Sequence, residues 1–231
     1  MRVLLIAGHG DGDSGAVKLG YKESDLTREL VKLIQTALSP YCEVDVADTS
    51  KNWYRHIIKN GAFVDFTMYD YVLEVHFNSN AKDEKGNGKT TGTEIYVTRS
   101  EKTVSVEENI VKGISALGFK NRGVKPMNFD LIYFIKRQGV SSALLEVCFL
   151  DDKDDVSLYQ SRKKEVASAV AQGIVKGYKL DGNTLRAACK VLSNAGIINS
   201  PDYWAKGAGY SDSNTVLLIK KFADYVKRKE N

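Results

Sequence analysis

The sequence predicts an α/β fold, in which a twisted, mainly parallel or mixed sheet is flanked by helices and followed by a small all-helical C-terminal module. Two observations support this. Short apolar runs alternate with amphipathic stretches through residues 1–180, and no strand pattern occurs after residue 184. The length of 231 residues is long for one minimal domain and short for two full ones. We therefore expect a large domain over residues 1–178 and a helical module over residues 184–231.

Strands and helices of the large domain are predicted from apolar spacing. Short runs rich in β-branched or aromatic residues predict five strands, Val3–Ala7, Glu43–Ala47, Tyr71–Val75, Thr93–Thr98 and Ala143–Phe149. Apolar residues at helical spacing predict three helices, Leu26–Leu38, Val104–Leu117 and Val156–Tyr178. The polar, glycine-containing segment Asp83–Thr91 predicts a surface loop.

The C-terminal module is predicted to contain two amphipathic helices. One apolar face is expected from Leu185, Ala188, Val191 and Leu192. A second is expected from Val216, Ile219, Phe222, Ala223 and Val226. About fifty residues are too few for a large independent core, so the module is a small helical appendage.

Composition and charge exclude several classes of protein. The chain has 43% hydrophobic and 27% charged residues, which excludes a disordered chain or a coiled-coil rod. The net charge of +4 comes with interspersed acids and no RNA-binding aromatic motif, so no nucleic-acid partner is expected. No apolar stretch is long enough for a membrane span. Cys42, Cys148 and Cys189 are far apart and predict reduced, buried thiols. Because the first strand begins at Val3, we expect no signal peptide and synthesis in the cytoplasm.

Two histidines and two glutamates form the candidate site. His9 and His76 directly follow predicted strands, where ligand sites of α/β sheets form. Glu146 lies inside an otherwise apolar strand, and burying an unpaired carboxylate costs several kcal/mol. Glu23 precedes the first helix. Two imidazoles and one carboxylate make the ligand set of a catalytic zinc site, with a further group to manage protons.

Each of these residues also has a structural interpretation. His9 could simply occupy a glycine-rich turn, and Glu23 could stabilise a helix N-terminus. Glu146 could be a core carboxylate paired with a basic residue. The third histidine, His56, has no acidic or glycine context and is expected at the surface.

Five segments form a recognisable series along the chain. The first is GHGDGDSGA at residues 8–16, followed by the glutamate that opens the first helix. The others are VHFN at 75–78, GTEIY at 92–96, RGVK at 122–125 and LLEVCFL at 144–150. Together these segments resemble the N-acetylmuramoyl-L-alanine amidases of the Amidase_3 class, and the likeness covers residues 2–178. The sequence departs from the family pattern at Asp11-Gly12, at Val140–Ser142 and at Cys148, which affects turn geometry and substrate fit but removes no ligand.

The resemblance implies a role for each candidate residue. His9, Glu23 and His76 would bind Zn²⁺, and Glu146 would act as the general base. The substrate would be peptidoglycan, cleaved at the lactyl amide between muramic acid and L-alanine. Polar residues that flank the motifs are expected to contact substrate, namely Asn78, Asn80 and Arg122.

Two other functions stay open at this stage. A carboxypeptidase-like zinc hydrolase uses a similar ligand set but requires an arginine-lined pocket for a substrate carboxylate. A non-catalytic wall-binding protein would not need all four site residues. The helical module is similar to a short module of some phage lysins of Gram-positive hosts, so the chain resembles an endolysin that acts on the wall after release. The module could target the wall through Tyr203, Trp204 and Tyr210, or these side chains could pack internally.

Overall fold

A computed structural model describes residues 1–180, 185–205, 217–218, 220–222 and 225. The chain divides into two compact units. The first contains Met1–Leu38 and Glu43–Lys179, and the second contains Ser39–Cys42 and Leu180–Asn231. Each unit is described by itself.

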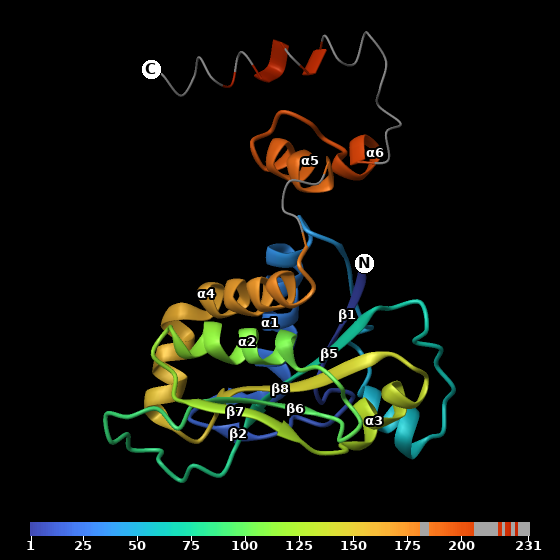
Figure 1. Ribbon diagram of the computed structural model, residues 1–231. Coiled ribbons are helices and arrows are strands. Elements are labelled where there is room, and N and C mark those ends of the chain that lie inside the picture. The colour runs from blue at the N-terminus through green and yellow to red at the C-terminus, as the bar shows by residue number, and fades with distance from the viewer. Residues whose placement is uncertain (181–184, 206–216, 219, 223–224, 226–231) are drawn as a thin grey trace. The chain divides into compact units, whose positions relative to one another are not determined.

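A six-stranded sheet forms the centre of the first unit, with the strand order β4-β1-β5-β8-β6-β7 (Figure 1). The strands are β1 (Arg2–Ala7), β4 (Glu43–Val46), β5 (Tyr71–Asn78), β6 (Thr93–Val97), β7 (Asn121–Pro126) and β8 (Ser141–Phe149). The pairs β1–β4, β1–β5, β5–β8 and β6–β7 are parallel, and β6 runs antiparallel to β8. The predicted mainly parallel, mixed sheet is confirmed.

Helices cover both faces of the sheet, because side chains along its strands point alternately to one face and the other. The three long helices α1 (Glu23–Leu38), α2 (Ser105–Ser115) and α4 (Lys153–Gly177) lie together on one side (Figure 1). On the other face, Leu4, Ile6 and Val72 pack in one buried cluster with residues of the short helix α3 (Asp130–Arg137) and the π-helical turn η1 (Arg55–Lys59). A two-residue hairpin, β2 (Val17–Lys18) and β3 (Tyr21–Lys22), precedes α1.

The N-terminus of α4 is fixed by carboxylates. Asp152 is fully buried and accepts hydrogen bonds from the backbone N–H groups of Asp154 and Asp155, as an N-cap residue does. Asp155, also fully buried, accepts bonds from the backbone N–H groups of Gly92 and Phe149. These bonds tie the helix to the start of β6 and the end of β8. The predicted loop 83–91 is mostly exposed, and its Thr91 bonds to Asp152.

The described helical part of the second unit consists of α5 (Leu185–Asn194), α6 (Pro201–Ala205) and a few later helical residues. The buried cluster of this helical part contains Cys189, Ile197 and Ile198. The predicted apolar face of α5 is wrong in part, because Val191 is 65% exposed and Ala188 is also exposed. Cys189, one position on from Ala188, faces the cluster instead, together with Leu192.

The second predicted face of this unit lies mostly outside the described residues. Phe222 is described and is half exposed, whereas Val216, Ile219, Ala223, Val226 and also Tyr210 lie outside them. The cysteines are free and buried, as predicted. Among the helices that the structure describes, none combines the length and apolar character that a membrane crossing requires.

Candidate metal centre and active site

The candidate residues meet where parallel strands of the sheet end. His9 follows β1, His76 lies near the end of β5, and Glu146 lies in β8. In the sheet register His76 pairs with Glu146, so both side chains lie on the same face. Glu23 is the first residue of α1. The structure thus brings together all four residues that the sequence singles out.

Glu23 joins the two histidines. Its Oε2 lies 3.1 Å from His9 Nε2, and its Oε1 lies 3.0 Å from His76 Nδ1. The two imidazole rings meet edge to face with their centroids 4.9 Å apart. One ligand atom from each of the three residues lies within 4.8 Å of the others, so the group can hold a metal ion.

In the turn after β1, the backbone passes close to the side chains of the candidate ligands. His9 has φ of 62°, a left-handed conformation that non-glycine residues adopt rarely and mainly at functional sites. A Cβ on Gly15 would lie 2.6 Å from both the Glu23 carboxylate and the His9 ring. A Cβ on Gly8 would likewise lie 2.3 Å from the ring of His76. Glycine at both positions lets the backbone pass directly behind the candidate ligands.

Carboxylates surround the histidines on their outer sides as well. His9 Nδ1 lies 3.1 Å from Asp13 Oδ2, and Asn52 donates to that same oxygen. His76 Nε2 lies 3.0 Å from Glu74 Oε1. Both carboxylates were missed in the sequence. Glu74 carries the signal that singled out Glu146, because it too interrupts an apolar strand.

The pKa values of the group reflect this concentration of carboxylates. Burial raises the pKa of Glu23, but hydrogen bonds from His76 and His9 outweigh it and hold the pKa well below its ordinary value. Burial lowers the pKa of His76, and the carboxylates of Glu74 and Glu23 reverse this and raise it well above the ordinary value. The site therefore favours positive charge between its carboxylates. Two imidazole nitrogens and a carboxylate oxygen form the donor set that zinc prefers, so these residues fit a zinc ion.

Glu146 lies beside this group without a hydrogen-bond partner for one of its oxygens. Its Oε2 atom is buried and unpaired among the described residues. Burial raises the pKa of Glu146 to about 7, and the carboxylates of Glu23, Glu94 and Glu74 add to the rise while His76 opposes it. A carboxyl group with a pKa near neutrality can take up and release a proton at physiological pH.

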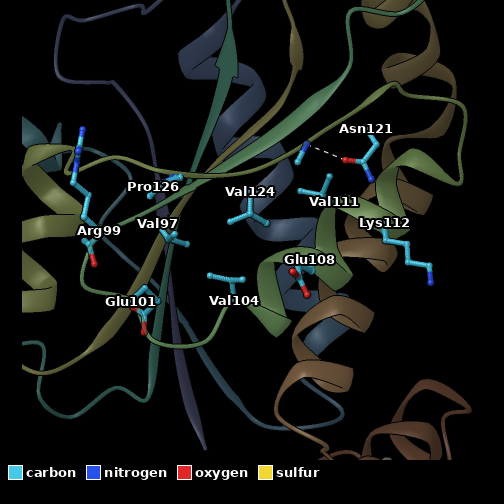
Figure 2. Close-up of a pocket in the computed structure, with 12 residues that line it drawn as sticks. Val97, Arg99, Glu101, Val104, Glu108, Val111, Lys112, Asn121, Val124 and Pro126 are labelled. Carbon is cyan, nitrogen blue, oxygen red and sulfur yellow. Dashed lines mark hydrogen bonds between the residues drawn. The ribbon is translucent and has the colours of Figure 1, made fainter.

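A pocket of about 390 Å³ opens over these groups. Its polar wall includes His9, His76 and Glu146, and its apolar wall includes Phe129, Leu131 and Leu144. A larger pocket of about 640 Å³ lies between α2 and the strands β6 and β7 (Figure 2). None of the four candidate residues lines that larger pocket, so the smaller one is the candidate active site.

Two of the three residues predicted to contact substrate, Asn78 and Arg122, bond to the buried carboxylate of Glu94. Asn78 Nδ2 donates to Glu94 Oε1 at 3.0 Å, and Arg122 Nε donates to Glu94 Oε2 at 2.6 Å. Lys125 also pairs with Glu94, whose side chain is buried. Arg122 and Lys125 thus neutralise a buried carboxylate that pairs with Glu146 across β6 and β8, and Asn78 adds a hydrogen bond to it.

The third predicted contact, Asn80, lies in an exposed loop with φ of 145°. Its backbone N–H donates to Asp151. His56 packs edge to face against Trp53 and is not a member of the metal group.

A family comparison decides the assignment. The family model described as "Amidase_3: N-acetylmuramoyl-L-alanine amidase" matches residues 3–176. The chain belongs to this family. The matched residues span all six strands of the sheet and the candidate metal centre.

Individual relatives agree with the family assignment. The chain is 29% identical over 183 residues to an endolysin of Bacillus phage SPP1, covering 75% of this chain and 65% of the relative. It is 27% identical over 180 residues to the N-acetylmuramoyl-L-alanine amidase LytC of Bacillus subtilis, covering 77% of this chain and 35% of LytC. The chain therefore spans between about a third and two thirds of the length of these relatives.

A solved structure shows the same fold. The catalytic domain of CwlV, an N-acetylmuramoyl-L-alanine amidase from Bacillus (Paenibacillus) polymyxa var. colistinus, superposes with a TM-score of 0.60 at 24% identity. The superposition covers 78% of this chain and all of that domain. At this identity the likeness concerns the fold.

Proposed function

We propose that this chain is a zinc-dependent N-acetylmuramoyl-L-alanine amidase that cleaves the lactyl amide between muramic acid and L-alanine of peptidoglycan. The observation that carries the proposal is the position of Glu146. A carboxyl group with a pKa of about 7 lies in the same pocket as His9 and His76, which with Glu23 can hold a metal ion. Family membership supplies the class of substrate.

His9, Glu23 and His76 would hold the zinc ion. Bound zinc acts as a Lewis acid toward a carbonyl oxygen and makes water a usable nucleophile near neutral pH. Asp13 holds the His9 ring from its outer side and is itself held by a hydrogen bond from Asn52, so this ligand is fixed before any metal arrives.

Glu146 would move the proton. In its ionised form it takes a proton from the attacking water as the oxygen adds to the lactyl carbonyl carbon. The same carboxyl group then donates that proton to the L-alanine nitrogen as the C–N bond breaks. Its products are a free carboxylate on the muramic acid and a free amine on the stem peptide. Leu144 and Phe129 line the pocket beside Glu146, so this transfer would take place against an apolar wall.

Mass spectrometry of digested peptidoglycan, with and without a zinc chelator, tests the proposal. We expect intact stem peptides with a free L-alanine amine, and we expect the chelator to abolish their release. Release of single amino acids would instead identify a carboxypeptidase-like hydrolase. No cleavage by zinc-loaded protein would indicate a non-catalytic wall-binding protein.

The biological setting belongs to the proposal as well. We infer a lytic role like that of an endolysin, supported by the likeness to the SPP1 endolysin. The chain would be made in the cytoplasm and would reach the wall on release. Expression in a Gram-positive host with and without a membrane-permeabilising partner tests this, because lysis should require the partner.

A further inference from the structure

Glu74 is a buried carboxylate with apolar neighbours on both sides. It lies in β5, where its register partners are Ile6 in β1 and Leu144 in β8. Only 5% of the residue is exposed. An ionised carboxylate in such surroundings destabilises the fold unless a specific partner compensates for its lost hydration. The structure gives Glu74 one such partner, His76.

The ring of His76 lies between two carboxylates. Its Nδ1 lies 3.0 Å from Glu23 Oε1, and its Nε2 lies 3.0 Å from Glu74 Oε1. Glu23 also reaches His9 through its other oxygen, so Nδ1 faces the candidate metal group. Nε2 faces out of that group. Glu74 itself lies outside the three-residue group whose ligand atoms are within 4.8 Å of one another.

We propose that Glu74 is a positioning residue that holds the proton of His76 on Nε2 and leaves the Nδ1 lone pair for the metal. A carboxylate that accepts the outer N–H of a ligand histidine fixes its tautomer and orientation and strengthens the ligand. Asp13 has the corresponding place on His9, where Nδ1 is the outer atom. The two histidines thus use different ring nitrogens, Nε2 of His9 and Nδ1 of His76. This inference rests on the zinc site of the proposed function.

Zinc affinity of the metal-free full chain, measured by competition with a chromophoric chelator, tests the role of Glu74. Glu74→Ala should weaken zinc binding about 10- to 100-fold, the usual effect of losing an outer-shell partner. Glu74→Gln keeps an acceptor oxygen without the charge, so its zinc affinity should fall less than that of Glu74→Ala.

Glu107→Gln is the matched control. Glu107 is 2% exposed and accepts a hydrogen bond of 2.8 Å from the Tyr71 hydroxyl, so it is another buried, hydrogen-bonded glutamate. It lies in α2 and does not line the candidate pocket. Its substitution should leave zinc affinity unchanged, and thermal unfolding of all variants records any general loss of stability.

A spectroscopic readout tests the same idea without relying on the alanine variant. Long-range ¹H–¹⁵N spectra of the zinc-loaded protein should show His76 protonated on Nε2 in the wild type and in Glu74→Gln. A proton on Nδ1 in the wild type would overturn the proposal, even if Glu74→Ala does not fold.

The remaining outcomes separate this inference from the proposed function. If the wild type binds no zinc, the proposed function itself fails. If the wild type binds zinc and Glu74→Ala binds it equally well, only the role of Glu74 is refuted. A loss as complete as that of His76→Ala would make Glu74 a metal ligand and would also overturn the positioning role.

Discussion

In the proposed mechanism, catalysis depends most directly on Glu146. It lies outside the metal group but shares the pocket with two of its members. Glu146→Gln removes the group that accepts and returns the proton and leaves the three candidate ligands in place. We therefore expect turnover to fall about 100-fold or more, since general base catalysis contributes about 10²–10⁴-fold. Zinc content by elemental analysis should equal that of the wild type. A folded variant with normal turnover would refute the role of Glu146.

Gly8 provides a second prediction, because a side chain at this position would collide with the ring of His76. A Cβ at this position would lie 2.3–2.6 Å from three ring atoms of His76. Gly8→Ala should therefore displace the imidazole and weaken zinc binding by about 10-fold or more, as the loss of ligand orientation does. Chelator competition on the metal-free protein measures this.

The control for Gly8→Ala lies in the same turn. Gly12 has φ of 80° and nothing within 4 Å of an added Cβ, so Gly12→Ala costs about 1 kcal/mol of backbone strain. Its zinc affinity should stay unchanged. Equal losses of zinc affinity in Gly8→Ala and Gly12→Ala would show that the conformation of the turn, and not the contact with His76, determines zinc affinity.

Individual site residues were predictable where an unusual residue stands in a clear pattern. A carboxylate in an apolar strand identified Glu146, and histidines after strands identified His9 and His76. The outer carboxylates Asp13 and Glu74 escaped notice because their role depends on which ring nitrogen they face, and that is a property of side-chain geometry. The pairing of Arg122 with Glu94 was not predictable for a similar reason, since Glu94 lies on another strand.

Among the elements, the junction of α4 with β6 and β8 carries a pH-dependent contribution to stability. Burial raises the pKa of Asp155 to about 6, although the Gly92 and Phe149 N–H groups and Arg122 oppose the rise. A carboxyl group whose pKa is higher in the folded state stabilises the fold below its unfolded pKa, and that stabilisation is lost as the pH rises through the folded pKa.

Asp155→Asn tests this contribution, because asparagine keeps an acceptor oxygen and does not ionise. Between about pH 4 and pH 7, the stability of the variant relative to the wild type should rise by up to about 3 kcal/mol, since each pKa unit corresponds to about 1.36 kcal/mol. Urea unfolding at a series of pH values measures the difference. A difference between the two proteins that does not change with pH would contradict the prediction.

The elements themselves were predictable where the hydrophobic period was long enough to recognise. All five predicted strands and all three predicted helices of the first unit form, with shifts at their ends. The missed elements are short or polar. The edge strand β7 has the sequence NRGVKP and is mostly half exposed, so it lacks an alternating pattern. The helix α3 has eight residues and the π-turn η1 has five, which is too short for a clear period.

At the scale of the whole molecule, the first unit contains its own core and its own site. The cluster that joins β1, β5, η1 and α3 lies entirely within it, as do all the candidate ligands. A fragment of residues 1–180 should therefore fold, bind zinc with the affinity of the full chain and cleave a soluble muramoyl peptide at the same rate. Loss of zinc binding on truncation would contradict this independence.

The second unit contains a pocket lined by aromatic and polar side chains, which makes the predicted targeting role testable. A pocket of about 460 Å³ is lined by the aromatic side chains of Tyr203 and Trp204 and by polar groups such as Asn199 and Lys221. Tyr203 is 48% exposed, whereas Trp204 packs partly into the small core of this unit. Trp204 thus packs internally in part, and the ring of Tyr203 meets the Trp204 ring edge to face at 6.4 Å while about half of the tyrosine stays exposed.

Sedimentation with purified cell walls tests the targeting role. The full chain should co-sediment more strongly than residues 1–180, because the fragment lacks the pocket. Tyr203→Ala should weaken binding about 2- to 10-fold, corresponding to the roughly 0.5–1.5 kcal/mol of an aromatic contact. Val191→Ala is the matched control, because Val191 is 65% exposed on α5 and does not line the pocket. Equal sedimentation of the full chain and the fragment would show that the second unit does not bind the wall.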